Sequence, residues 1–564
     1  MAALPLSHQG LFAQFNYLGQ LLCLHEQRQG RPAVERSPLL QSCQVAPAAS
    51  GLQGLPALET LAPRATTLLD QARSLGDRQA QSYAAGYLGA VYQQLNNLSA
   101  AQTATEQSLT VLSAYDAPAL AYVWQWQLAR LNRRQGRWDS ANRAYTLAWE
   151  TLQSLRSDLV TVSPEVQFNF RDRVEPVYRE RVELLLQGDA PSQENLHQAL
   201  ETLETLQLAE LNNFFQEACL IAQPQQIAQF DQEAAAIYPI VLGDRLVVIL
   251  ARPQAPLSFH VIPGVGASEI EETYNKLYSL LNPSIFAADP LGPHQQFYDW
   301  LVRPLEDQLA ATSVQTLVFV LDGVLRGLPL AALHDGQHYL LEKYNLAIAP
   351  GLRLLQADKL TPERLSVLLA GLSEARDGFA PLPGVEAEFA GASAIAADTE
   401  LLLNETFTRE QLAMAIADDT FPIVHLATHG RFSSQAEKTF LLAWNDRIQV
   451  RDLAILLQSR RGPQQKPIEL LILSACETAA GDDRAALGLA GVAVRSGARG
   501  TLATLWAVDD ASTAEATVAF YEQLRQGKIN KAAALRQAQL KLLQSEQYRH
   551  PYYWAPFVFI GNWL

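Results

Sequence analysis

Two short apolar stretches in the second half of the chain decide the fold. Residues 421–430 read Phe-Pro-Ile-Val-His-Leu-Ala-Thr-His-Gly, and residues 468–478 read Ile-Glu-Leu-Leu-Ile-Leu-Ser-Ala-Cys-Glu-Thr. Each is an almost unbroken apolar run that closes on small polar residues, which is typical of a strand buried on both faces of a parallel sheet. We therefore predict two core β-strands here, with His429 just beyond the first and Cys476 just beyond the second.

Other parts of the sequence contain similar short apolar runs, which predict further strands of the same sheet. Apolar runs at residues 314–323, 365–372 and 499–508 are bounded by Gly, Asp or Ser and separated by helical segments. Upstream, residues 236–253 form two β-rich runs joined by Gly243-Asp244, which predicts a hairpin. Strands that alternate with helices indicate an α/β domain with a largely parallel sheet flanked by helices. We place its start near residue 236.

The preceding part of the chain has a helical pattern. Residues 61–235 carry apolar side chains at spacings of three and four, which predicts an all-α domain, whereas residues 1–60 are weakly patterned and read as a linker. Small and aromatic residues at fixed offsets indicate two tetratricopeptide-like helix pairs. The first copy contains Leu88, Gly89, Tyr92 and Ala101, and the second contains Leu128, Ala129, Gly136, Trp138, Ala141, Tyr145 and Ala148.

Length, charge and cysteine content narrow the class of protein. The chain has 564 residues, which predicts two to four domains, and a net charge of −15, which works against nucleic-acid binding. The cysteines, Cys23, Cys43, Cys219 and Cys476, form no CxxC pair, so we expect neither a zinc site nor a disulfide framework. The sequence has no run of 18 apolar residues and no leader-like start. We expect a soluble protein of the reducing cytoplasm that binds no membrane.

His429 and Cys476 are the candidate catalytic residues. Their separation is 476 − 429 = 47 residues, and Ala475 precedes the cysteine, which resembles the caspase pattern of a histidine about 50 residues upstream. A thiol needs a base because only the thiolate is a strong nucleophile, and an imidazole within reach can remove its proton. The backbone N–H groups of Gly430 and Cys476 are candidates to hold the developing oxyanion.

Each residue taken alone also has a structural interpretation. A lone cysteine at a strand end is usually a small core residue, and a lone histidine before glycine usually lies in a turn. Their joint order and spacing at the ends of core strands favour a site. His425, inside the first strand, reads as a packed and hydrogen-bonded core histidine, with support of the site as the alternative.

Several motifs together resemble the CHAT family, the caspase-like domains associated with tetratricopeptide repeats and with HetF, a protease of bacterial cell differentiation. The motifs are HLATHG at 425–430, LILSACET at 471–478, GLAGVAVRSGARG at 488–500, TLWAVDD at 504–510 and HPYYWAPFVFIGNW at 550–563. The resemblance implies a peptidase of the caspase, separase and gingipain clan, with His429 and Cys476 matching the family dyad. It also implies a non-catalytic half at 236–360, a catalytic half at 361–564, and a six-stranded sheet whose open edges leave the oligomeric state undecided.

The resemblance extends to substrate choice. TLWAVDD is similar to a separase segment in which an acidic residue faces a substrate arginine, which makes Asp510 the first candidate and Asp509 the second. A buried carboxylate can bind a guanidinium through two hydrogen bonds. Asp482 and Asp483, which follow the nucleophile, could serve instead. The alternative for Asp510 is that it caps the helix that begins at Ala511.

These observations favour a cysteine endopeptidase that cleaves after Arg, with Lys second. Its partners would be a protein or peptide substrate with a basic cleavage residue and a protein regulator bound by the helical repeats. The sequence has no Walker-type GxxxxGK[ST], no HExxH and no dinucleotide fingerprint, so we expect no cofactor and no metal. The competing readings are a protein-interaction scaffold without turnover and an acyltransferase or other thiol hydrolase.

Overall fold

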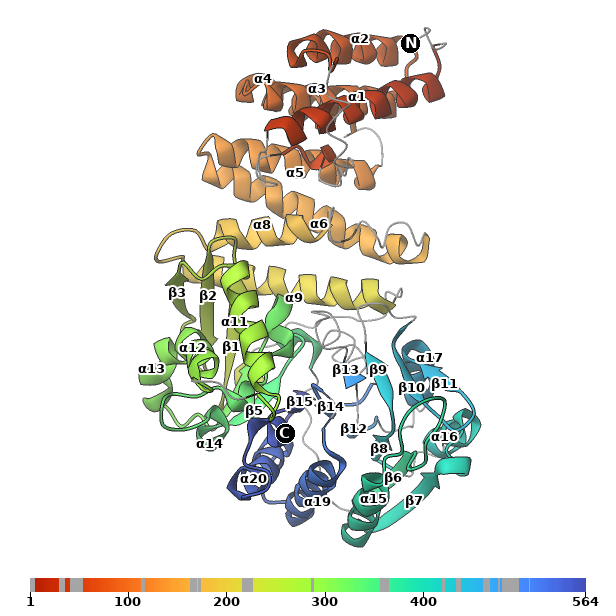
Figure 1. Cartoon of the computed structure of the whole chain (residues 1–564). Helices are drawn as coiled ribbons and strands as arrows, with labels where there is room; N and C mark the ends of the chain where they lie inside the picture. The colour runs from red at the N-terminus through yellow and green to blue at the C-terminus, as the bar shows by residue number, and fades with distance from the viewer. Residues whose placement is uncertain are drawn as a thin grey trace. The chain divides into compact units, whose positions relative to one another are not determined.

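The computed structural model forms two compact units, residues 1–209 with 216–218 and residues 210–215 with 219–564. It describes residues 6–29, 36–40, 54–112, 117–162, 170, 174–215, 227–285, 289–355, 365–417, 421–432, 438–459, 467–474, 477–478, 497–506 and 508–564. Figure 1 gives the element labels used below.

The first unit is all helical. Its helices are α1 (His8–Gln29), α2 (Leu61–Ser74), α3 (Arg78–Gln94), α4 (Leu98–Leu112), α5 (Pro118–Arg134), α6 (Trp138–Val162), α8 (Glu175–Leu185) and α9 (Gln193–Phe215), the last of which continues into the second unit. Helix α3 packs against α4, and α5 against α6, so the two predicted helix pairs are present. At Gly89 a Cβ atom would lie 2.6 Å from the Thr105 hydroxyl, so only glycine permits this close approach of α3 and α4.

Two expectations for the first unit were wrong. The predicted linker at residues 1–60 contains the 22-residue helix α1, whose Leu11, Phe15, Leu18 and Leu22 are buried against α2 and α3. Their spacing of three and four is helical, but uncharged polar residues dilute it. Cys23, also on α1, is disulfide-bonded, so the expectation of no disulfide fails. The other three cysteines lie outside the described residues.

The second unit contains one large mixed sheet. Its strands are β1 (Ala234–Val241), β2 (Arg245–Ala251), β3 (Ser258–Pro263), β4 (Thr316–Phe319), β5 (Asn345–Ile348), β6 (Ser366–Gly371), β7 (Asp398–Leu403), β8 (Ile423–Ala427), β12 (Leu470–Ser474), β14 (Gly500–Thr504) and β15 (Phe557–Gly561). Their order is β3-β2-β1-β4-β5-β15-β14-β12-β8-β6-β7. The predicted core strands are all present, and β1 and β2 form the predicted hairpin at Gly243-Asp244.

Strand β15 explains why the sheet is larger than the six strands expected. It pairs antiparallel with β14 and parallel with β5, and therefore joins the β1-β4-β5 group to the β14-β12-β8-β6-β7 group. Within each of these groups all neighbouring strands are parallel. Together with β15 and the strands β2 and β3, the two groups make a continuous sheet of eleven described strands.

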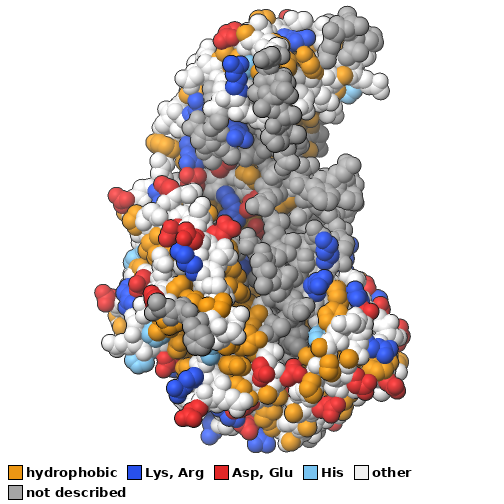
Figure 2. Space-filling model, viewed as in Figure 1, with side chains coloured by type: hydrophobic (Ala, Val, Ile, Leu, Met, Phe, Trp, Pro, Cys, Tyr) orange, Lys and Arg blue, Asp and Glu red, His pale blue; other side chains and the backbone are white. Residues whose placement is uncertain are grey.

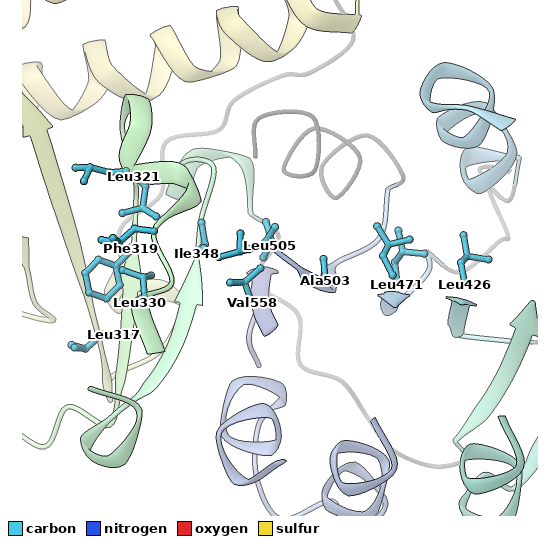
Figure 3. Close-up of a cluster of buried hydrophobic side chains, with 14 of the residues drawn as sticks. Leu317, Phe319, Leu321, Leu330, Ile348, Leu426, Leu471, Ala503, Leu505 and Val558 are labelled. Atoms are coloured by element: carbon cyan, nitrogen blue, oxygen red, sulfur yellow. The ribbon is translucent and has the colours of Figure 1, made fainter. Parts of the chain in front are cut away.

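Helices flank this sheet, and one hydrophobic core runs along it. The helices are α10 (Ile227–Phe230), α11 (Ala267–Leu280), α12 (Gly292–Leu301), α13 (Glu306–Ala310), α14 (Leu340–Lys343), α15 (Gly384–Ile395), α16 (Arg409–Ala417), α17 (Val450–Gln458), α19 (Asp510–Gln526), α20 (Lys531–Gln544) and α21 (Pro551–Trp554). Figure 3 shows buried side chains following one another across the strands, from Phe319 on β4 through Val558 on β15 to Leu471 on β12 and Leu426 on β8. The core is therefore shared by both strand groups.

The face of the molecule that Figure 2 shows carries no single field of charge. In Figure 2, acidic and basic side chains are interspersed on the face shown. Among the described helices, none combines the length and hydropathy needed to cross a membrane. Within the same part of the chain, no group of three or more His, Cys, Asp or Glu side chains could hold a metal ion.

Candidate active site

The site is built on two adjacent parallel strands, β8 and β12. Their register pairs Leu470 with Ile423 and Ser474 with Ala427, so both strands end at the same edge of the sheet. The two apolar runs predicted as strands therefore end side by side. In such sheets, functional residues lie in the loops that follow the carboxyl ends of the strands. His429 lies two residues beyond the end of β8.

The two chains remain adjacent after they leave the large sheet. The short strand β9 (Gly430–Phe432) pairs in parallel with β13 (Glu477–Thr478), so that Arg431 lies opposite Glu477. Strands β10 (Phe440–Leu442) and β11 (Arg447–Gln449) complete this second, four-stranded sheet. The segment around His429 therefore pairs with the segment around Cys476 on both sides: β8 with β12 before His429, and β9 with β13 after it. Cys476 falls between Ser474 and Glu477 in the sequence but lies outside the described residues.

The His429 ring is held in one orientation. Its Nε2 lies 2.7 Å from the carbonyl oxygen of Ala380, and the ring stacks on Phe379 with centroids 4.8 Å apart and planes 29° apart. A carbonyl oxygen can only accept, so Nε2 carries the hydrogen and Nδ1 is the nitrogen that can take up a proton. The backbone carbonyl of His429 accepts a hydrogen bond of 2.8 Å from Leu442 N.

A tight hairpin places Phe379 and Ala380 against this ring. Arg376 and Phe379 exchange backbone hydrogen bonds, with Asp377 (φ +50°) and Gly378 (φ +84°) at the turn, a conformation that favours Gly and Asp. The Arg376 guanidinium lies 3.8 Å above the Trp444 ring centroid, and its Nε donates to the Trp444 carbonyl at 2.7 Å. The hairpin is therefore tied to the turn between β10 and β11.

The structure separates the roles of Asp509 and Asp510. Asp509 is the N-cap of α19 and accepts a hydrogen bond of 3.1 Å from Ser512 N. The alternative that Asp510 caps this helix is therefore wrong. Asp510 is the first helical residue, and its carboxylate accepts a long hydrogen bond of 3.4 Å from Gly384 N at the start of α15.

The surroundings of Asp510 change the pKa of its carboxyl group. Burial raises the pKa of the Asp510 carboxyl, the Gly384 hydrogen bond opposes this, and the carboxylates of Asp509 and Glu388 raise it further. His429 acts in the opposite direction and lowers the pKa of Asp510, which places the two groups within electrostatic reach of each other. A Cβ atom at Gly384 would lie 2.6 Å from the Asp510 Cβ, so only glycine lets α15 and α19 approach this closely. Asp510 is thus a partly desolvated acid near the predicted base.

His425 is a packed and hydrogen-bonded histidine, as predicted. It is fully buried on β8, with Nε2 3.2 Å from the Ser474 hydroxyl and 3.0 Å from a carboxylate oxygen of Glu388. Its Nδ1 lies 3.3 Å from the Tyr521 hydroxyl. Four buried polar side chains therefore meet directly behind the strand ends.

The remaining predicted residues are only partly placed. Gly430 is the first residue of β9 and pairs with Leu441. Cys476, Asp482 and Asp483 lie outside the described residues. Sequence reasoning did not single out Phe379, Ala380, Gly384 or Glu388. For Glu388 a signal existed, since it is an acid among the inward-facing apolar positions Val385, Phe389 and Ala392.

Comparisons with known proteins place this geometry in a wider context. No curated protein matches the sequence. Among solved structures, the Arg-specific cysteine proteinase gingipain R matches with 10% identity, covering 52% of this chain and 74% of that chain, with a TM-score of 0.31. The structure of the pro- and mature domains of Porphyromonas gingivalis RgpB matches with 10% identity, covering 52% and 76%, with a TM-score of 0.32.

A separase is also among the similar structures. The Saccharomyces cerevisiae separase–securin complex matches with 10% identity and a TM-score of 0.41, covering 98% of this chain and 53% of that chain. This chain thus spans about half the length of the separase chain. One protein-family model matches as well, and its match covers β4 to β15 and every described residue of the site. Residues 292–562 of this chain are a CHAT domain.

Proposed function

We propose that the chain is a cysteine endopeptidase in which Cys476 is the nucleophile and His429 the general base. The observation that carries the proposal is the orientation of His429. Its Nε2–H is bound to the Ala380 carbonyl, which leaves Nδ1 as the proton acceptor at the end of β8. Pairing of β8 with β12 and of β9 with β13 brackets the sequence positions around both residues, which supports their proximity.

The reaction follows from thiol chemistry. His429 Nδ1 takes the proton from the Cys476 thiol, and the thiolate attacks the scissile carbonyl carbon. The N–H groups of Gly430 and Cys476 stabilise the oxyanion, and its collapse expels the amine, which receives the proton from His429. Water then loses a proton to His429 and attacks the thioester, which releases the carboxylic acid and restores the thiol.

For specificity, we propose that Asp510 binds an arginine side chain, with lysine second. Its partial burial makes an unpaired carboxylate unfavourable, and a guanidinium with two parallel hydrogen bonds would relieve this cost. Asp509 already bonds to Ser512 N as a helix cap, so it is the weaker candidate. Asp482 and Asp483 remain alternatives for the same role.

The helical unit is proposed to hold a protein substrate or a protein regulator, because helix pairs of this kind present extended binding surfaces. We expect a chain without residues 1–209 to cleave short peptides as the full chain does but to lose activity toward the protein substrate. Equal activity toward that protein would contradict this role.

Hydrolysis of fluorogenic peptides ending in Arg, Lys, Asp or Leu tests the proposal. We expect Arg-selective cleavage that falls at least about 1000-fold in Cys476→Ala and in His429→Ala. Cys219→Ala, which removes a cysteine elsewhere in the chain, is the matched control and should retain activity. An Arg-directed covalent probe should label the full chain but not Cys476→Ala.

The outcomes separate the competing functions. Cleavage without preference for Arg would contradict the role of Asp510 while leaving the dyad intact. Probe labelling without peptide cleavage, combined with transfer of the acyl group to another acceptor, would favour an acyltransferase. Neither labelling nor cleavage would favour a scaffold without turnover.

A further inference from the structure

Four buried polar side chains form a connected group behind the site. The Ser474 hydroxyl donates to Glu388 Oε2 at 3.2 Å, while His425 Nε2 lies 3.2 Å from that hydroxyl and 3.0 Å from Glu388 Oε1. The Tyr521 hydroxyl lies 3.3 Å from His425 Nδ1. All four side chains are at most 4% exposed. An ionisable group of this kind in a core lowers stability unless it is fully paired, so its position calls for an explanation.

The members of this group come from the four elements that carry the proposed active site. His425 is on β8, which leads to His429, and Ser474 is the last residue of β12, two positions before Cys476. Glu388 lies one turn after Gly384 on α15, and Tyr521 is on α19, which begins at Asp510. Among the contacts described above, no other group of side chains joins all four of these elements. The group therefore links the elements that carry the proposed base, the proposed nucleophile and Asp510.

The residue types Ser, His and Glu also occur in hydrolase triads, but this geometry differs. In a triad the serine and the acid bind opposite nitrogens of the histidine. Here Ser474 and Glu388 both lie at Nε2, and Tyr521 occupies Nδ1. Ser474 is also only 4% exposed, so a substrate cannot reach its hydroxyl. The group is not a second catalytic centre.

We propose that Glu388, His425, Ser474 and Tyr521 are positioning residues, which lock the ends of β8 and β12 in register with each other and with Asp510 at the start of α19. The catalytic consequence rests on the proposed function above. Directional hydrogen bonds fix relative position more tightly than apolar packing does, and a displacement of about 1 Å at reacting groups lowers rates on the order of 100-fold.

The test uses the full chain and compares matched pairs of variants. His425→Gln is paired with His294→Gln, because His294, on α12, is also buried and bonds to the Ala332 carbonyl. Tyr521→Phe removes one hydroxyl and is paired with Tyr145→Phe, which removes a buried hydroxyl bonded to Glu180 in the helical unit. If His425→Gln does not fold, the tyrosine pair still gives the answer.

Two measurements decide the inference. By hydrogen exchange with mass spectrometry, the amides of residues 428–432 should exchange on the order of 10-fold faster in His425→Gln and Tyr521→Phe than in their controls. On the Arg peptide, kcat should fall on the order of 10-fold with KM within about twofold. Controls that lose similar thermal stability should show neither change.

Exchange at residues 428–432 that stays the same as in the controls would overturn the inference, whether or not the chain cleaves peptides. A full chain that cleaves nothing and resists the covalent probe would instead overturn the proposed function. The exchange measurement would then still decide whether the group holds the strand ends.

Discussion

The Asp510 carboxyl lowers the stability of the fold at neutral pH. Burial raises its pKa in the folded state above the ordinary value of 3.8, so the folded protein takes up this proton before the unfolded chain does. Stability from this group is therefore present at low pH and is lost as pH rises through the folded-state pKa. A side chain that disfavours its own charge is suited to bind a cation from a substrate.

We accordingly expect Asp510→Asn to raise the unfolding temperature at pH 7 while it abolishes cleavage after Arg. The amide oxygen can still accept the Gly384 hydrogen bond, and the charge is gone. The gain should shrink as pH is lowered toward 4, where Asp510 itself becomes protonated. Thermal melts of both proteins at pH 7 and pH 4.5 measure this, and a lower melting temperature of the variant at pH 7 would contradict it.

Lys531, on α20, gives a second test of buried charge. Burial lowers its pKa to about 8, and it stands at the first position of α20, where the helix dipole opposes a cation. The folded state thus loses the proton more readily than the unfolded chain, so stability increases as pH rises from about 8 toward 10.5.

Lys531→Met should therefore stabilise the protein at pH 7 by up to about 3 kcal/mol, since one pKa unit corresponds to about 1.4 kcal/mol. The difference should become smaller above pH 8. Urea unfolding of both proteins at pH 7 and pH 10 provides the measurement, and a variant that is less stable at pH 7 would show that the lysine is well paired.

Among the elements, the hairpin at Arg376–Phe379 places Phe379 and Ala380 in contact with His429, the proposed base. Its turn needs a positive φ at Gly378, which a β-branched residue adopts only with strain on the order of 1–3 kcal/mol. We expect Gly378→Val to displace Phe379 and Ala380 from His429 and to lower kcat on the Arg peptide on the order of 10-fold.

Gly336→Val is the matched control for this change. Gly336 also has a positive φ, and neither glycine has a neighbouring atom within 4 Å of an added Cβ. Both variants should lose similar thermal stability, but only Gly378→Val should lose activity. Equal kcat values in the two variants would contradict the role of the hairpin.

The strands and the helix pairs could be predicted because their signals are local. Unbroken apolar runs identified β8 and β12, and small residues such as Gly89 identified the packed helix pairs. Helix α1 was not predicted, because its polar face carries glutamine and glycine. Charged residues at these positions would have indicated the solvent-facing side of a helix. The four-stranded sheet was not predicted, because strands of two or three residues are too short to show an alternating pattern in the sequence.

For the site, the sequence predicted the residues at strand ends but not what holds them. His429 followed from its strand, whereas its contacts with Phe379 and Ala380 depend on a loop about 50 residues upstream, as the 2.7 Å bond to Ala380 shows. Asp510 stays a candidate acid. The sequence could not decide which aspartate caps the helix, because Asp509 and Asp510 have the same capping chemistry. Only the backbone geometry at the start of α19 shows that Asp509 is the cap.

At the scale of the whole molecule, the disulfide at Cys23 predicts the number of free thiols. Four cysteines less one pair leave at most two, so the denatured protein prepared without reductant should react with two equivalents of a thiol reagent. After reduction the count should rise to four. A count of four without reductant would show that Cys23 is not paired in solution.

Strand β15 has a consequence for how the protein is made. During translation, β5 and β14 emerge from the ribosome well before residues 557–561, which must insert between them. Until then each half of the nascent sheet carries an open edge that can pair with other chains. The two halves can therefore join only late in synthesis. Ribosomes stalled before residue 557 should therefore carry a chain whose two half-sheets are still separate and open to capture by chaperones.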